Sequence, residues 1–172
     1  MTTTTFQDTL KNQFQTIITH RRYLHQHPEL SFQETNTAAF IAQQLSSYGI
    51  AVQTQVGGNG VIGFIQGGNS GPTIAFRADF DALPITDQKD VPYKSIVDGV
   101  CHACGHDGHT AALLGFAYVL QQNHEALHGN IKLIFQHAEE KPPGGAKSIV
   151  EAGVLNDVDF IFGAHVAPDL PV

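Results

Sequence analysis

The chain has 172 residues, of which 42% are apolar, and its formal net charge is −7. This length and composition are those of one ordinary globular domain and exclude a disordered chain. The acidic residues are scattered, which argues against binding to nucleic acid or to an anionic membrane surface. No stretch approaches the roughly 18 to 20 apolar residues that span a bilayer. We therefore expect a small molecule or a short peptide as the partner.

Cysteine usage and the N-terminal segment bear on the cellular compartment. The only two cysteines are Cys101 and Cys104, too few for the disulfide framework of a small secreted protein. Residues 1–5 lack both the basic segment and the apolar stretch of a secretory signal. These features predict a cytoplasmic protein.

Two helices are predicted at the start of the chain. From Phe6 to Gln26 the apolar residues recur at a spacing near that of an α-helix, which indicates an amphipathic helix. Pro28 restricts the residue before it and ends this helix. A second helix is predicted from about Glu34 to Tyr48, and Gly49 follows it as a typical helix stop.

The next segments have the composition of strands. Residues 50–56 and 61–66 are short runs rich in β-branched residues, and the glycine-rich segment 57–60 between them predicts a strand pair with a tight turn. Residues 73–79 are more continuously apolar, which is typical of an interior strand covered on both faces.

The second half of the chain alternates between helices and strands. Residues 82–100 show no clear period and are predicted to form a long loop, a kind of segment that is usually functional. Two helices, at 108–122 and 146–152, and two strands, at 131–137 and 159–166, are predicted after it. The fold class is therefore α/β, with a mixed, largely parallel central sheet flanked by helices.

The densest group of chemically active side chains is the segment 101–110. It holds two cysteines, three histidines and an aspartate, and an apolar helix follows it. Thiolate and neutral imidazole are the ligands that borderline transition metals prefer. The segment therefore predicts a metal site near the N-terminus of that helix, with further ligands from elsewhere in the chain.

Three predicted strands end on ionisable side chains, namely Asp79 with Asp81, Glu139 with Glu140, and His165. Ligands of open α/β sheets bind at the carboxyl ends of the strands, so we expect these groups to meet the segment 101–110 in one crevice. Neighbouring side chains of an extended backbone point in opposite directions. One glutamate could then bind metal while the other, beside a metal-bound water, acts as a general base.

Several residues of this segment also have simpler interpretations. Cys101 and Cys104 have the spacing of a thiol redox pair, although Cys101 by itself is typical of a packing residue. His102 and His109 are expected to support the site or the fold rather than bind metal. Asp107 is either an N-cap of the following helix or a participant in the chemistry.

Five ordered segments resemble the M20 metallopeptidase superfamily, in the branch of amidohydrolases that cleave N-acyl amino acids, hippurate and auxin conjugates. The segments are His25–Phe32, Arg77–Ile85, Cys104–Thr110, Phe135–Glu140 and Gly163–Val166.

The resemblance implies a ligand set for a pair of divalent ions (Zn, Mn, Co or Ni): Cys104, His106, Glu140 and His165. It also implies that Glu139 is the base, taking a proton from a metal-bound water that then attacks the amide carbonyl. Asp81 resembles the acidic residue that supports this site. The implied reaction is hydrolysis of the amide bond of N-acyl amino acids.

The resemblance covers only part of the family's chain. Members of the family continue through a lid and dimerisation domain and then complete the catalytic domain, where a further histidine ligand lies. Residues 1–172 correspond to the N-terminal part of the catalytic domain, so the other parts are expected to be absent. The complete enzyme is expected to be a homodimer. The alternative for this chain is a non-catalytic fragment that binds metal partially or not at all.

Overall fold

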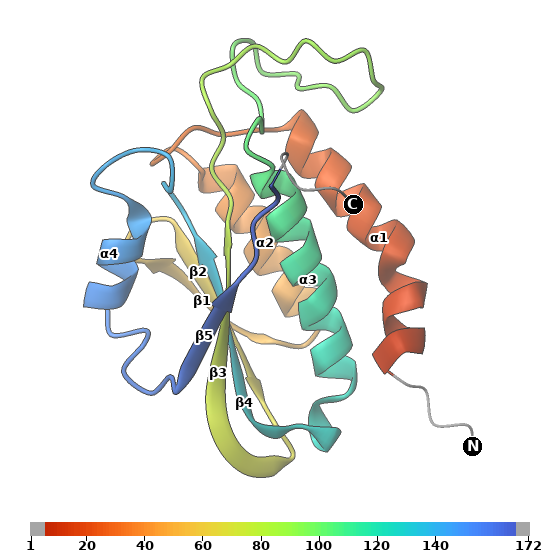
Figure 1. Cartoon of the computed structure of the whole chain (residues 1–172), viewed down its shortest axis with the longest axis vertical. Helices are drawn as coiled ribbons and strands as arrows, with labels where there is room; N and C mark the ends of the chain where they lie inside the picture. Colours follow the sequence, from red (N-terminus) through yellow and green to blue (C-terminus); the bar gives the residue numbers. More distant parts are fainter. Residues whose placement is uncertain (1–5, 168–172) are drawn as a thin grey trace.

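The computed structural model describes residues 6–167. Figure 1 shows the course of the chain through four helices, five strands and one 3₁₀ turn at His124–Ala126. In chain order the helices and strands are α1 (Phe6–Gln26), α2 (Thr35–Ser47), β1 (Ala51–Val56), β2 (Gly60–Gln66), β3 (Asn69–Asp79), α3 (His106–Gln122), β4 (His128–Gln136), α4 (Gly145–Glu151) and β5 (Phe160–Gly163).

The strands form one mixed sheet in the order β1-β2-β4-β3-β5. β1 pairs with β2, and β2 with β4, in antiparallel register, whereas β3 is parallel to both β4 and β5. The predicted mixed α/β sheet is confirmed. Its three adjacent parallel strands bring their carboxyl ends to the same edge, because parallel strands run in one direction.

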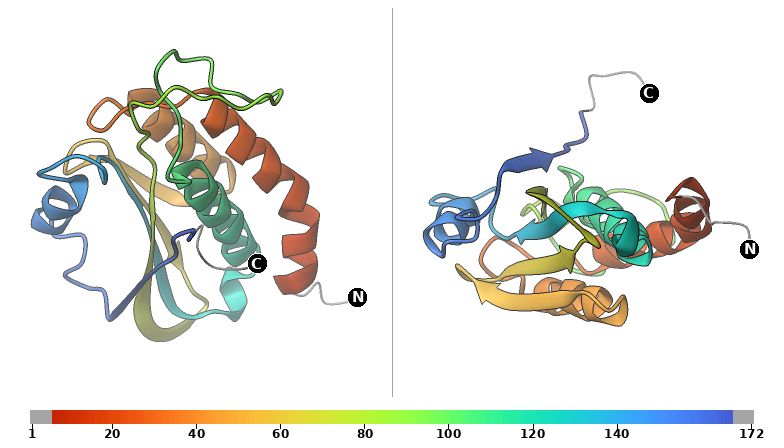
Figure 2. Two further views of the ribbon diagram at one scale, coloured as in Figure 1. Left: turned by 45° about the horizontal axis from the view of Figure 1, so that its top comes forward. Right: turned by 90° about the horizontal axis from the view of Figure 1, so that it is seen from below.

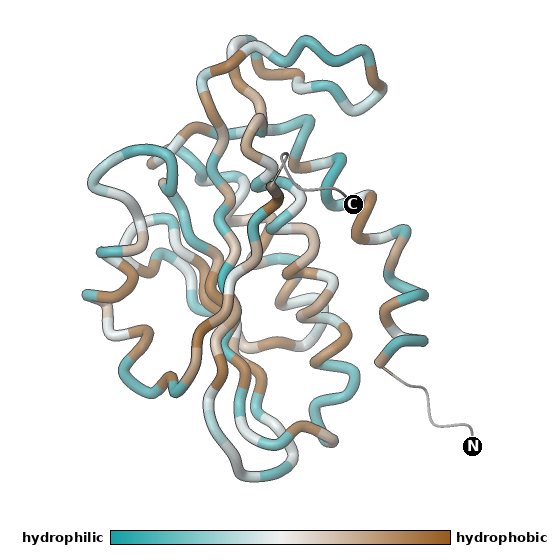
Figure 3. The backbone as a smooth tube through the Cα atoms, viewed as in Figure 1, coloured by the Kyte–Doolittle hydropathy of each residue, from teal (hydrophilic) through white to brown (hydrophobic). Residues whose placement is uncertain are grey.

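The sheet is covered on both faces, but unequally. Figures 1 and 2 show α1, α2 and α3 on one side and α4 on the other. Successive residues of β4 divide between the two faces: Leu133 and Phe135 pack in the core beneath α2 and α3, and Ile134 packs in the smaller core beneath α4. Figure 3 shows the apolar residues concentrated along these strands. The sheet is therefore rigidly held at β4.

Several element boundaries differ from the prediction. α3 begins at His106 rather than at residue 108, so a predicted metal ligand is its first residue. β3 begins at Asn69, earlier than predicted. β5 covers only Phe160–Gly163 of the predicted 159–166, because its pairing with β3 ends at Gly163. His165 therefore lies beyond the strand rather than within it.

The segment 82–100 contains no helix or strand, as predicted. It crosses above α1 and α3 in Figure 1 and is tied to the end of α1, where the side chain of Gln26 donates to the carbonyl of Pro92 at 3.1 Å. Within residues 6–167 there is no helix with both the length and the apolar character needed to cross a bilayer.

Candidate metal centre

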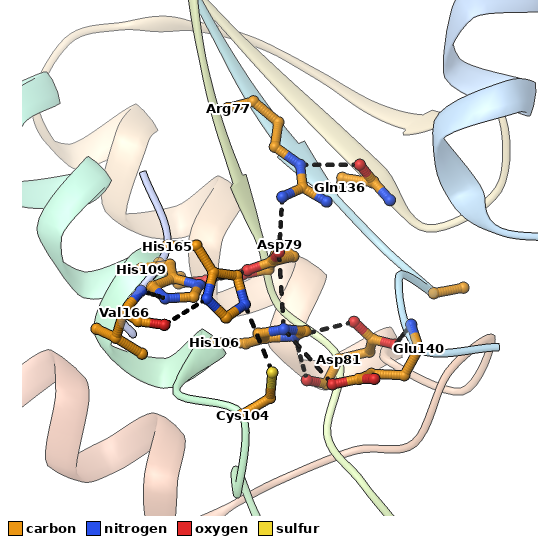
Figure 4. Close-up of polar contacts among 12 residues, drawn as sticks. Arg77, Asp79, Asp81, Cys104, His106, His109, Gln136, Glu140, His165 and Val166 are labelled. Atoms are coloured by element: carbon orange, nitrogen blue, oxygen red, sulfur yellow. Dashed lines mark hydrogen bonds and ion pairs between the residues drawn. The ribbon is translucent and has the colours of Figure 1, made fainter. Parts of the chain in front are cut away.

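The predicted site residues converge at the carboxyl edge of the parallel strands. β3 leads to the aspartates, β4 to the glutamate pair and β5 to the last histidine, while the start of α3 faces them (Figure 4). Two overlapping groups have ligand atoms within 4.8 Å of one another: Asp79, His106, His109 and His165, and Cys104, His106 and Glu140. The four residues predicted as ligands all fall in these groups, and His106 belongs to both.

Asp81 is the centre of the buried part of the site. Its side chain is 1% exposed and accepts hydrogen bonds from the Ser31 hydroxyl (2.6 Å) and from the backbone N–H of Glu140 (3.0 Å). Burial opposes ionisation of this carboxyl, but the hydrogen bonds from His106, Ser31 and the backbone hold its pKa well below the usual range. Asp81 therefore stays charged and positions the segment that carries both glutamates.

His106 has one ring nitrogen engaged and one directed at the carboxylates of the site. Its Nδ1 lies 2.9 Å from the carbonyl oxygen of Asp81 and 3.2 Å from that residue's carboxylate, so the proton is on Nδ1. The Nε2 lone pair is then free. It is buried, has no hydrogen-bond partner, and lies 3.7 Å from Glu140 Oε1, another buried atom without a partner. Asp79 Oδ2 lies 3.6 Å from the same nitrogen, and although burial opposes it, the hydrogen bond to Asp81 and the nearby carboxylates raise the pKa of His106. A proton on Nε2 or a cation between these atoms would satisfy them.

Cys104 and His165 form the opposite wall of the site. The Cys104 sulfur lies 3.5 Å from His165 Nε2. Burial, together with the Glu140 carboxylate, raises the pKa of the Cys104 thiol to about 11. Burial also raises the pKa of the Cys101 thiol. Thiols with raised pKa values are poor attacking groups in disulfide exchange, which disfavours the redox interpretation of this pair.

Glu34 contacts the segment that leads from β4 to Glu139 and Glu140, and this role was not predicted from the sequence. Its side chain is fully buried, and Oε1 accepts the backbone N–H of Ala138 (2.7 Å) while Oε2 accepts from the amide of Asn59 (3.0 Å). Ala138 has a φ of 48°, a strained value for a residue other than glycine. The hydrogen bond to Glu34 helps to hold this turn, which directs the chain towards Glu139 and Glu140.

Glu139 and Glu140 differ in exposure, although they lie in a bend after β4 and not in the extended backbone assumed from the sequence. Glu140 is partly buried and faces His106, whereas Glu139 is exposed to solvent. The backbone N–H groups of both residues donate to Asp81. The Glu140 carboxylate thus faces the ligand cluster, and the Glu139 carboxylate faces solvent.

Asp107 does not cap α3, so the N-cap interpretation is wrong. Gly105 is the N-cap residue, and no side-chain cap is present. The Asp107 carboxylate instead accepts from His25 Nδ1 at 2.8 Å, and His25 Nε2 contacts Asp87 at 3.2 Å. This buried network ties α1, α3 and the long loop together. The neighbouring His102 is buried as well, and burial lowers its pKa to about 4, so it is neutral at pH 7.

Comparisons with known proteins place the chain among proteins of one family. Residues 75–172 match the model of peptidase family M20/M25/M40. The chain is 58% identical over 153 residues to YhaA of Bacillus subtilis, which carries an amidohydrolase name, covering 89% of this chain and 39% of that protein. It is 46% identical over 150 residues to the N-acyl-L-amino acid amidohydrolase of Geobacillus stearothermophilus, covering 87% of this chain and 40% of that protein.

A solved structure has the same fold. The YXEP protein of Bacillus subtilis, described as a dinuclear metal binding peptidase, superposes with a TM-score of 0.89 at 49% sequence identity, covering 94% of this chain and 45% of that chain. The chain thus spans less than half the length of these relatives.

Proposed function

The chain belongs to peptidase family M20/M25/M40, and on that premise we propose that it is the N-terminal part of the catalytic domain of a metal-dependent amidohydrolase acting on N-acyl amino acids. The observation that carries this proposal is the pair of buried ligand atoms without a hydrogen-bond partner, His106 Nε2 and Glu140 Oε1, at 3.7 Å. The amidohydrolase names of similar proteins support the substrate class.

The donor set fits a pair of divalent ions. It combines a thiol, two imidazoles and a carboxylate, which suits zinc and its first-row neighbours. The proposed ligands are Cys104, His106, Glu140 and His165. When bound, such ions supply Lewis acidity that polarises a carbonyl and makes water a stronger acid. Which ion is bound stays a prediction, as do the cytoplasmic location and the homodimer.

Glu139 is the proposed general base. It lies next to Glu140 but is exposed, so its carboxylate is free to accept a proton from the attacking water and to return it to the leaving amine. Asp81 fixes the backbone of both glutamates and the tautomer of His106. In this scheme Asp81 positions the groups around the reaction without meeting the substrate.

A second candidate is favoured by the length of the match. Because the chain spans about 40% of its curated relatives, it can also be a non-catalytic fragment that binds metal partially or not at all. Assaying the 172-residue chain on a panel of N-acetyl amino acids separates the two, and turnover by this chain alone would reject the fragment.

The metal assignment is tested by Zn²⁺ and Mn²⁺ titrations of the chain. Glu140→Ala is expected to weaken binding strongly, whereas Glu139→Gln should bind metal normally and, in the full-length protein, lose hydrolysis. Unchanged metal affinity in Glu140→Ala would contradict the ligand assignment. Glu151→Gln, on the exposed face of α4, is the control for a simple loss of negative charge.

A further inference from the structure

We propose that Asp79 and His109 form a positioning pair that fixes His165 for metal binding by holding the peptide group of Val166. The proposal rests on the function proposed above. It assigns roles to two buried residues that are within reach of the metal centre but were not predicted as ligands.

The hydrogen bonds of His109 determine its tautomer. The backbone N–H of Val166 lies 3.0 Å from His109 Nε2, and a backbone N–H can only donate, so Nε2 is the unprotonated nitrogen. Nδ1 then carries the proton and donates it to Asp79 Oδ1 at 2.7 Å. Both ring nitrogens are therefore engaged. His109 has no free lone pair for a metal ion, although it lies within a group that has metal-ligand spacing.

Val166 links this pair to His165. His165 Nδ1 lies 2.6 Å from the carbonyl oxygen of Val166, so the Nδ1 proton is donated there and the Nε2 lone pair is left free, on the side of the ring that faces Cys104. Val166 thus accepts a hydrogen bond from His165 through its C=O and donates one to His109 through its N–H. The His109 and His165 rings are also in contact, with centroids 4.4 Å apart.

This link is needed because the chain has left the sheet. The pairing of β5 with β3 ends at Gly163, two residues before His165. Among the residues that the structure describes, the backbone of 164–167 makes no other hydrogen bond to α3 or β3. Residues 160–167 are all exposed, so burial does not hold them. The hydrogen bond from Val166 to His109 is therefore the backbone attachment that places His165, whose ring also contacts the Cys104 sulfur.

The side chain of Val166 reinforces the attachment. A Cβ built at Gly105 would lie 2.6 Å from Val166 Cγ2, closer than real atoms approach. Gly105 also has a φ of 91°, which favours glycine. The glycine between Cys104 and His106 therefore leaves the space that Val166 fills. Both the side chain and the backbone of Val166 are docked on the first turn of α3.

Asp79 is held firmly enough to orient its partner. It is fully buried at the end of β3, its other oxygen accepts from Arg77 at 2.7 Å, and its backbone carbonyl accepts from the Thr110 hydroxyl at 2.9 Å. Partners of this kind, which orient a ligand without touching the metal, typically change metal affinity 10–100-fold when they are removed.

A double-mutant cycle on the 172-residue chain tests the proposal, with Co²⁺ affinity measured by competition against a chelator. His109→Leu is expected to weaken Co²⁺ binding by about 10–100-fold, and His165→Ala by at least as much. The double variant should bind no more weakly than His165→Ala alone, because His109 acts through His165. His109→Gln, which keeps an acceptor for the N–H of Val166, should recover most of the loss.

Controls separate positioning from loss of folding. His124→Leu, in the 3₁₀ turn beyond the other end of α3, should leave Co²⁺ affinity unchanged. In the metal-free chain, His109→Leu should speed amide hydrogen exchange at Val166 while residues of β4 stay protected. Additive losses in the cycle, or unchanged affinity in His109→Leu, would overturn the positioning role and leave His165 as a ligand. Unchanged affinity in His165→Ala would overturn the ligand assignment as well.

Discussion

β4 and β5 flank β3 on either side and are both parallel to it, yet the two strands are held very differently. β4 is largely buried between two cores, whereas every residue of β5 is exposed. Each leads to one wall of the proposed metal centre, β4 to Glu140 and β5 to His165. The two walls are therefore supported to different degrees.

The difference continues beyond the strand ends. The segment after β4 is fixed by two buried carboxylates, since Glu34 accepts from Ala138 and Asp81 accepts from Glu140. Among the described residues, the backbone of the segment after β5 has one hydrogen bond to α3, from the N–H of Val166 to His109. In this chain, the glutamate wall is preorganised by the core, while the His165 wall depends on a local contact with α3.

The largest effect is expected from truncating a matched aromatic residue in each strand. Phe135 of β4 is fully buried, so Phe135→Ala should lower the free energy of unfolding by about 3–5 kcal/mol. Phe162 of β5 is 55% exposed and stacks on Phe76, so Phe162→Ala should cost less than about 1 kcal/mol. Urea unfolding of the 172-residue chain measures both. Equal losses would show that β5 is as firmly held as β4.

The fold was largely predictable because its signals are local. Runs of β-branched residues mark the strands, and the carboxyl-end rule places Asp81, Glu140 and His165 at one edge of the sheet. The end of β5 was predicted three residues too late because the apolar character of Val166 continues the strand pattern. Hydrogen bonding to β3 ends at Gly163, which composition does not reveal.

The supporting residues were not predictable for a different reason. Glu34 resembles any polar residue at the start of a helix, and its partner Ala138 is 104 positions away. Asp107 is a residue type common at N-caps and lies at the start of a helix, but its carboxylate accepts a hydrogen bond from His25, 82 positions away. Such contacts depend on tertiary packing, and a single sequence contains no local signal for them.

Glu34→Gln should have the next largest effect, because it tests the support beneath the glutamate wall. Both carboxylate oxygens accept from donors, so the new NH₂ group must face either the N–H of Ala138 or the amide of Asn59. We expect a loss of about 2 kcal/mol in the free energy of unfolding. Glu151→Gln, at the exposed end of α4, should change it by less than about 0.5 kcal/mol. Equal effects of the two variants would show that Glu34 gives no special support.

The smallest effect is expected for His137, at the end of β4, in the pH dependence of the free energy of unfolding. His137 follows β4 and is buried, and burial lowers its pKa below the ordinary value of 6.5 although Glu34 opposes the shift. In the pH range just below 6.5 the unfolded chain therefore binds the proton more readily than the folded chain. The stability contributed by neutral His137 is complete above pH 6.5 and declines as the pH falls, by at most about 1.4 kcal/mol per pH unit for one proton.

His137→Gln should flatten this decline in urea unfolding measured between pH 7 and 5, whatever its effect on stability at pH 7. His20 of α1 offers a matched comparison, because burial lowers its pKa as well. The two residues lie on separate elements and share no hydrogen-bond partner, so the flattening in His20→Gln should add to that in His137→Gln. If His137→Gln left the pH dependence of the unfolding free energy unchanged, the His137 ring would be solvated and protonated as readily in the folded chain as in the unfolded chain. The glutamate wall would then be no more rigid than the exposed wall that carries His165.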